Sequence, residues 1–514
     1  MTKTDLRAAM ARPALILLTV CLAAAAMQLT FTGPAVALPA IGQALGGSPI
    51  ALNWVTNAFM LTFGSSLMAA GALADAYGRK RVFLIGVGAF AILSMALSAA
   101  PDILWFDLGR AAQGVAAAAA FSGGMAALAQ EFDGPARIRA FSIVGTSFGV
   151  GLAFGPVASG LMIDAFGWRS IFGLVVALAV LSFLLGTRFL KESRDPNAAG
   201  LDGRGALSFT AALALFTYGV LLAPERGWTD PGVASLLTGA MVLFVAFGVI
   251  ERRVPRPMLD LTLFRYPRFV GVQLLAAAPA YAFVVLLILL PVRFIGIEGL
   301  SEIVAGRLMI ALSAPLLILP IAAGLLTRWF APATICGVGL LVSALGLFWL
   351  SRMPIGGDVL RLIAPMALIG IGIALPWGLM DGLAVSVVPR ERAGMATGIF
   401  STTRVAGEGV ALAVVSAVLS ALTAGHLAGT GASASTSQAA QRLVTGDLAS
   451  AAEALPRIGG TVLVRAYGDA FAMLLLMLCA VTIVTAIVVF VFLGYGAEAA
   501  TERPDEADEP LCPS

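Results

Sequence analysis

Stretches of 18 or more predominantly apolar residues recur from one end of this chain to the other. Each stretch is long enough to cross the roughly 30 Å hydrocarbon layer of a bilayer as a helix. Within that layer only helices and closed barrels satisfy every backbone hydrogen bond. A barrel would show alternating segments of about ten residues, whereas these stretches are continuously apolar and rich in Ala, Leu, Val and Gly. We therefore expect an all-α integral membrane protein.

The composition argues against an enzyme. Charged residues make up 12% of the 514 residues, about half the share that is usual in soluble domains. The single histidine, His426, falls in a predicted loop, and the four cysteines are far apart in the sequence, at Cys21, Cys336, Cys479 and Cys512. These residues support no haem, zinc or histidine-based catalysis. We expect no catalytic residue, metal or cofactor.

The apolar stretches predict fourteen spans. Lys3, Arg7 and Arg12 precede the first stretch in the manner of a signal peptide. That stretch continues to about Ile41, however, and further spans follow, so we expect the first span to be retained. The predicted spans are 13–38, 50–73, 82–100, 103–126, 140–163, 170–190, 205–223, 232–250, 269–292, 303–326, 333–350, 362–387, 398–422 and 471–494.

Lysine and arginine residues predict the orientation of these spans. Of the 32 such residues, 21 fall in the N-terminal segment, the C-terminal tail and one alternate set of connections, and 9 fall in the other set. The remaining two, Arg110 and Arg404, lie within spans or at their ends. Because positive charge is enriched on the cytoplasmic side, both termini are expected in the cytoplasm. The expected location is the cell inner (plasma) membrane.

A charge cluster follows the second span, in the segment Gly71-Ala-Leu-Ala-Asp75-Ala-Tyr-Gly78-Arg79-Lys80-Arg81. The first glycine permits close helix contact, and Gly78 permits a tight turn at the membrane surface. An acid beside three cations can form ion pairs in one conformation and lose them in another, as a conformational latch requires. The basic residues alone would be explained equally well as a topology signal.

The fourth span carries Arg110, with Gln113 and Gly114 following at helical spacings that place all three on one face. An arginine buried inside a membrane span is costly and indicates a functional site. Arg110 lies only a few residues inside the span, so a side chain that reaches back to the interface is the alternative.

The fifth span contains a glycine-rich pattern, Gly151-x3-Gly155-Pro156-x3-Gly160. The spacing of four residues between its first two glycines makes a groove for close helix packing. The proline removes one backbone hydrogen bond and allows a bend.

These three patterns resemble motifs of the major facilitator superfamily. In that family the acid and basic residues of the loop stabilise the outward-facing state, the span-four arginine is implicated in proton coupling, and the span-five motif occurs in exporters. The resemblance assigns the latch to Gly71, Asp75, Gly78, Arg79 and Arg81, proton coupling to Arg110, and the antiporter motif to Gly151, Gly155, Pro156 and Gly160. Ser147 and Ser159 depart mildly from that motif, where glycine is frequent.

Other segments resemble the fourteen-span drug:proton antiporter branch of this family. They are Trp54-Val55 with Phe59-Met60-Leu61, then 168–172, 251–264, and Gly394-Met-Ala-Thr-Gly398 with Arg404 and Gly407. The resemblance spans roughly residues 13–494 and implies two six-helix bundles plus two inserted helices. The expected parts are an N-terminal bundle at 1–200, an insertion at 201–256, a C-terminal bundle at 257–496 with a long outer loop at 424–470, and a disordered acidic tail at 497–514.

The chain departs from this branch in the first span. Thr30 stands where an aspartate commonly carries protons or binds cations, which weakens proton coupling and cation recognition at that position. Asp381 and Glu408 lie about seven and ten residues inside their spans and could take over, because a desolvated carboxylate can load and release a proton near neutrality. An ion pair of Glu408 with Arg404, one turn earlier, is the structural alternative for that residue.

The leading interpretation is a secondary active transporter that exports a small organic compound, a drug or a metabolite, by proton antiport through alternating access. The chain contains no GxxxxGK[ST] phosphate loop for the use of ATP. An uptake symporter, an integral membrane enzyme and a transport-dead sensor are the alternatives. The span-five motif, the lack of converging catalytic groups and the short tail argue against them in turn.

The substrate is expected to bind in a central cavity. The candidate cavity residues are Thr30, Gln113 and Trp377. Aromatic residues scattered along the spans would suit an apolar or aromatic compound, although packing explains any single one equally well: Phe31, Phe59, Phe148, Phe154, Trp377 and Phe400. The expected partners are this small molecule, protons and the lipid bilayer. Nucleic acid is not expected, and the resemblance implies a monomer.

Overall fold

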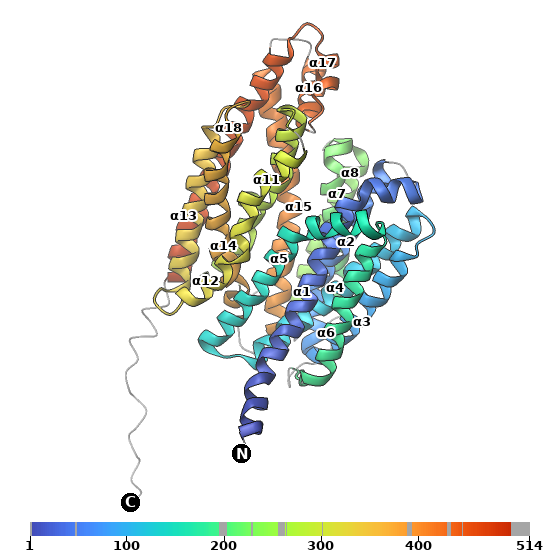
Figure 1. The fold of residues 1–514 in the computed structure, drawn as a ribbon, viewed down its shortest axis with the longest axis vertical. Coiled ribbons are helices and arrows are strands. Elements are labelled where there is room, and N and C mark those ends of the chain that lie inside the picture. The colour runs from blue at the N-terminus through green and yellow to red at the C-terminus, as the bar shows by residue number, and fades with distance from the viewer. Residues whose placement is uncertain are drawn as a thin grey trace, which may run out of the picture.

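The computed structural model describes residues 3–46, 49–194, 203–227, 230–254, 263, 265–300, 302–387, 393–428, 433–444 and 446–494. Over these residues every regular element is a helix, which confirms the all-α prediction (Figure 1). Twelve of the helical segments are long and apolar enough to cross a membrane. The remaining two predicted spans, 140–163 and 205–223, lie in helices α5 and α7. The count of fourteen spans stays a prediction.

Six helices form what we call the N-terminal half. Apolar side chains from these helices gather in a core that includes Phe83, Phe90 and Phe121. Helix α1 packs against α5 and α6, and α4 packs against α2 and α3. Their bounds are α1 Lys3–Leu45, α2 Pro49–Tyr77, α3 Arg79–Ser98, α4 Ile103–Glu131, α5 Gly134–Phe166 and α6 Ser170–Phe189.

The elements from α9 onward form what we call the C-terminal half, which has its own core around Phe283, Phe294 and Leu340. Its first span changes from α- to π-helix twice, and its second contains a short 3-10 turn. The bounds are α9 Pro267–Pro279, η2 Ala280–Val284, α10 Val285–Pro291, η3 Val292–Ile297, α11 Glu302–Ser313, η4 Ala314–Leu317, α12 Leu319–Leu326, α13 Pro332–Ser351, η5 Val359–Leu362, α14 Ile363–Ser386, α15 Ala393–His426, α16 Ser433–Val444, α17 Leu448–Ala454 and α18 Gly460–Gly494.

Two further helices, α7 (Gly203–Arg226) and α8 (Pro231–Glu251), pack against each other. In the sequence they come between the N-terminal half and the C-terminal half. Helix α7 contacts both α2 and α15, and Tyr218 packs on Trp54 of α2 with ring centroids 5.1 Å apart. Helix α8 leaves large apolar side chains exposed, including Met241, Val242 and Val245. Such a surface suits contact with lipid.

The segment 424–470 differs from the long loop expected there. Helix α15 continues to His426, and α18 begins at Gly460, so both helices extend beyond the predicted spans. Between them lie α16 and α17, whose apolar residues Leu443 and Ala451 join the core of the C-terminal half. These two helices lie at the end of the molecule opposite the start of α1 (Figure 1). The predicted tail at 497–514, and most of the 251–264 motif, fall outside the described residues.

Candidate functional site

The predicted latch lies where α2 ends and α3 begins. Gly78 separates the two helices with a φ of 117°, a backbone conformation that side chains with a Cβ rarely adopt. The turn brings Arg79 back onto Asp75. The Arg79 Nε and Nη2 atoms donate to Asp75 Oδ1 at 3.0 and 2.7 Å. Arg79 is 1% exposed, so this is a buried charge with a charged partner.

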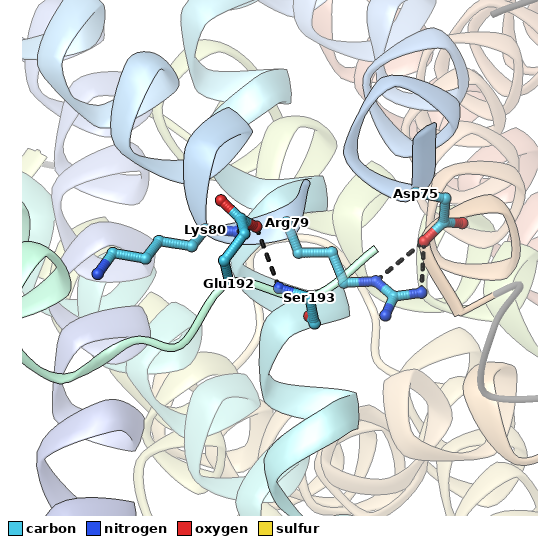
Figure 2. Close-up of polar contacts among 5 residues, drawn as sticks. All are labelled: Asp75, Arg79, Lys80, Glu192 and Ser193. Atoms are coloured by element: carbon cyan, nitrogen blue, oxygen red, sulfur yellow. Dashed lines mark hydrogen bonds and ion pairs between the residues drawn. The ribbon is translucent and has the colours of Figure 1, made fainter. Parts of the chain in front are cut away.

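A second acid completes the latch from the far side of Arg79 (Figure 2). Glu192 accepts from the backbone N–H groups of Lys80 and Arg81, at 3.2 and 3.1 Å. The backbone N–H of Arg79 donates to the Ser193 carbonyl at 2.9 Å. A carboxylate at the start of α3 meets unpaired N–H groups and the positive end of the helix dipole. Gly71 is buried in α2, whereas the side chain of Arg81 is exposed.

Arg110 in α4 is fully buried within the protein, and two of its nitrogen atoms bond to protein groups. Its Nε donates to the Val55 carbonyl at 2.7 Å, and its Nη1 donates to Gln113 at 2.5 Å. Gln113 in turn donates to Ser94 at 2.8 Å. The guanidinium carbon lies 4.5 Å from the ring centroid of Phe59, a cation–π contact.

The glycine-rich pattern lies in α5, which is helical throughout. A Cβ on Gly151 would lie 2.5 Å from the Cβ of Gln28, so this glycine permits the close approach of α1. Gly155 is also buried, whereas Gly160 has open space around it. The side chain of Pro156 is outside the described part of the structure. Groove packing is therefore visible at Gly151.

A cavity of about 80 Å³ lies between the two halves. Its walls come from α1, α2 and α5 on one side and from η2, α10, α14 and α15 on the other. It is smaller than the 300 Å³ or more of usual drug-sized pockets, so the halves have to move apart before a drug-sized compound fits. The lining residues are Met27, Gln28, Phe31, Phe59, Met60, Phe63, Phe148, Val284, Leu287, Trp377, Arg404, Val405 and Glu408.

Arg404 carries the positive charge of this cavity. Its Nη1 lies 3.4 Å from both carboxylate oxygens of Asp381, and each residue is 5% exposed. Its guanidinium carbon is 5.7 Å from the ring centroids of Phe148 and Phe400. Glu408, one turn further along α15, also lines the cavity. Among the described residues Arg404 is ion-paired with Asp381 rather than with Glu408.

Of the three residues expected at the cavity, Trp377 lines it and the other two do not. Gln113 is fully buried between Arg110 and Ser94, and its side chain is used for packing the N-terminal half together. Thr30 comes one residue before Phe31, about 100° around α1 from the side chain that does line the cavity. It is also fully buried.

Residues 18–412 match the family model described as Major Facilitator Superfamily, which is well over half of the chain. The chain belongs to the major facilitator superfamily. Two solved structures of this superfamily, at 14% sequence identity, share its fold. They are the human organic anion transporter MFSD10 (TM-score 0.58, covering 91% of this chain and 98% of that one) and the proton:xylose symporter XylE (TM-score 0.59, 94% and 96%).

Sequence comparison aligns this major facilitator with resistance and export proteins. The multidrug resistance protein Stp of Mycobacterium tuberculosis strain CDC 1551 is 33% identical over 75% of this chain and 72% of its own length. The puromycin resistance protein pur8 of Streptomyces alboniger is 33% identical over 77% and 80%. The tetracenomycin C resistance and export protein of Streptomyces glaucescens is 26% identical over 79% and 76%.

Two features of the transporter were missed at the level of sequence. Glu192 falls in none of the motifs identified in the sequence, although it accepts hydrogen bonds from the backbone at the start of α3, more than 110 positions back along the chain. Asp381 and Arg404 were each identified in the sequence, but their ion pair was not predicted. It joins two different helices, so the spacing of residues along the chain does not indicate it.

Proposed function

We propose that this protein is a secondary active exporter of small organic compounds that works by alternating access and proton antiport. The relatives named for multidrug resistance, puromycin resistance and tetracenomycin C export support the direction of transport. The fold alone does not decide it, because the proton:xylose symporter has the same fold.

One observation carries the proposal: a cavity between the halves is lined by Arg404 and Glu408, and Arg404 is ion-paired with a further acid, Asp381, which does not line the cavity itself. Alternating access needs a binding site that both halves share. Proton coupling needs an ionisable group at that site whose charge alters the contacts between helices. Protonation of Asp381 would remove the charge that holds Arg404, freeing α15 from α14. Glu408 is the second candidate proton site. Arg110 is the third residue that we propose takes part in proton coupling.

Close contacts between the halves gather at the ends of the helices that we propose face the cytoplasm. Ser142, near the start of α5, donates to the carbonyl of Gly378 in α14. A Cβ on Gly398 in α15 would lie 2.9 Å from Met68 in α2. Towards the other end of α5, Gly160 has nothing near it. Together with the formed latch at Asp75 and Arg79, this arrangement fits a conformation closed towards the cytoplasm.

The same proposal includes the placement and the parts of the transporter. Both termini lie in the cytoplasm, the location is the inner (plasma) membrane, and the working unit is a monomer. The N-terminal bundle comprises residues 1–200, the insertion 201–256 and the C-terminal bundle 257–496. The separate apolar cores of the two halves support this division. Uptake by symport stays as the second candidate function, since it would use the same cavity in the opposite direction.

The proposal is tested with purified protein in liposomes that contain a pH-sensitive dye, under an imposed proton gradient. Lipophilic cations and neutral aromatic compounds are added one at a time. An exporter moves protons when its compound is present, and Arg110→Ala abolishes that movement. Compound flux without any proton movement would contradict antiport. Proton movement in the same direction as the compound would favour the symporter.

A further inference from the structure

One residue of the cavity lining, Trp377, carries a buried hydrogen-bond donor that has no acceptor among the described residues. Trp377 is 5% exposed and lines the cavity, and its Nε1 is buried with no partner among the described residues. An indole N–H can only donate. Leaving a buried donor unpaired is costly, so such a group calls for an explanation in the working cycle.

The indole ring of Trp377 has neighbours in both halves of the molecule. The ring of Phe283, in the π-helical turn η2, meets it edge-on, with centroids 6.1 Å apart at 70°. In the other half of the molecule, a Cβ on Gly145 of α5 would lie 3.6 Å from Trp377 Cδ1. The ring therefore packs on Phe283 of its own half and lies next to α5 of the other half. Phe283 and Trp377 belong to the same half, so their contact stays when the halves separate and keeps the donor oriented for a ligand.

The rest of the cavity wall offers mostly aromatic and aliphatic surface. Phe31, Phe59, Phe63 and Phe148 line it from the N-terminal half, and the rings of Phe59 and Phe63 stack with centroids 5.7 Å apart. Aromatic rings favour offset or edge-to-face contact with another ring. A flat aromatic ligand would bury its faces against these side chains once the halves separate.

The other polar residues of the described lining do not offer a neutral donor that lacks a partner. Arg404 is occupied by Asp381, and Glu408 is an acid that accepts hydrogen bonds when ionised. Gln28 has a partner of its own. Trp377 is thus the neutral, unpaired donor of the described lining.

Resting on the export proposed above, we infer that the substrate is a planar aromatic compound whose ring system carries a hydrogen-bond acceptor such as a carbonyl oxygen. Trp377 Nε1–H donates to that oxygen, while the phenylalanine side chains pack against the rings. Trp377 is then a specificity-determining residue. It favours compounds that bear the acceptor over compounds of the same shape that lack it, because the second kind leaves the N–H unpaired.

The test uses fluorenone and fluorene, two flat three-ring molecules of the same outline that differ in a carbonyl group. Their affinities for the native protein in detergent are measured by equilibrium dialysis and expressed as a ratio. Trp377→Phe keeps an aromatic ring and removes the N–H. We expect the preference for fluorenone to fall about five- to tenfold in this variant, the effect of one buried hydrogen bond, with fluorene affinity unchanged.

The chain offers a matched control in Trp349, which is 42% exposed on α13. Trp349→Phe should leave the affinity ratio as it is in the native protein. An unchanged ratio in Trp377→Phe would overturn the inference and would indicate that water satisfies the N–H. Absence of fluorenone binding to the native protein would overturn it as well. Since dialysis uses no proton gradient, either result is distinct from a failure of the antiport proposal.

Discussion

The proposed latch at the end of α2 and the cluster of Arg404, Asp381 and Glu408 beside the central cavity each pair an arginine with an acid. The two ion pairs differ in length. Arg79 is held by Asp75 at 2.7 and 3.0 Å, and the neighbouring backbone is capped by Glu192. Arg404 lies 3.4 Å from both oxygens of Asp381, and Glu408 nearby takes no part in that pair. The ion pair of the proposed latch is short in this conformation, whereas the ion pair of Arg404 with Asp381 is longer and has a second acid nearby.

We interpret this difference as a division of roles, in which the proposed latch stabilises one conformation and the cluster of Arg404, Asp381 and Glu408 responds to the proton. Short, fully partnered charges bias a conformational equilibrium towards the state in which they form. Longer contacts around a buried arginine leave room for the pair to break when one acid becomes neutral. The predictions below separate these two roles.

The largest effect is expected from Arg404→Leu. It leaves Asp381 as a buried carboxylate without its cation, an arrangement that costs roughly 3–5 kcal/mol when the acid stays charged. We expect transport in proteoliposomes to fall by about 100-fold or more. Arg361→Leu is the matched control, because its ion pair with Asp358 is exposed and should matter little. An Arg404→Leu protein with half of the native rate would show that the pair has no part in the cycle.

Asp75→Asn should have a smaller effect, and one that falls on the conformational equilibrium. It replaces a charged acceptor of Arg79, and hydrogen bonds between charged groups contribute roughly 1.5–3 kcal/mol. We expect the ratio of the population closed towards the cytoplasm to the open population to fall about tenfold. Spin labels at Asp133 and Phe330, in a protein without its native cysteines, report the distance between the two halves on that side.

The control for Asp75→Asn is Asp358→Asn, which changes an exposed acid with a weak ion pair at 3.9 Å. It should leave the distance distribution unchanged. If Asp75→Asn also gave the native distance distribution, the latch interpretation would be wrong. The basic residues would then serve only to orient the spans in the membrane.

Glu192→Ala is expected to act in the same direction but more weakly. The substitution removes an acceptor for two backbone N–H groups at the start of α3, comparable to the loss of a helix cap, which costs about 1 kcal/mol. We expect the population open towards the cytoplasm to rise about threefold to fivefold in the same spin-label measurement. Glu453→Ala, at an exposed acid in α17, is the control. If Glu192→Ala shifted the populations more than Asp75→Asn does, the expected order of the two effects would be wrong. The backbone cap by Glu192 would then contribute more to the latch than the ion pair.

The same contrast explains what could be predicted from the sequence. Asp75 and Arg79 are four residues apart, so local spacing was sufficient to place them together. The lengths of the apolar stretches likewise predicted the helices, because a helix needs about 20 apolar residues to cross a bilayer. Asp381 and Arg404 are 23 residues apart on different helices, and Glu192 is more than 110 residues from Lys80. Such contacts depend on how the helices pack, which neither periodicity nor charge content determines.

The cavity shows the same limit. Four of the six aromatic residues considered for it, namely Phe31, Phe59, Phe148 and Trp377, do line it. Phe400 instead packs beside Arg404, and Phe154 has an undescribed side chain. Thr30 and Gln113 were predicted at the cavity but do not line it. Rotation about the helix axis, in the case of Thr30, and a partner on another helix, in the case of Gln113, placed them elsewhere.

The account depends most on Asp381 and Glu408 as the groups that carry the proton. The decisive measurement is compound flux in liposomes, with and without an imposed pH gradient, for the native protein and for the double variant Asp381→Asn, Glu408→Gln. We predict that the gradient accelerates flux in the native protein and not in the double variant. A variant with the exposed acids changed, Asp358→Asn with Glu453→Gln, should respond as the native protein does. Flux that remains fully dependent on the pH gradient in the double variant would contradict the account.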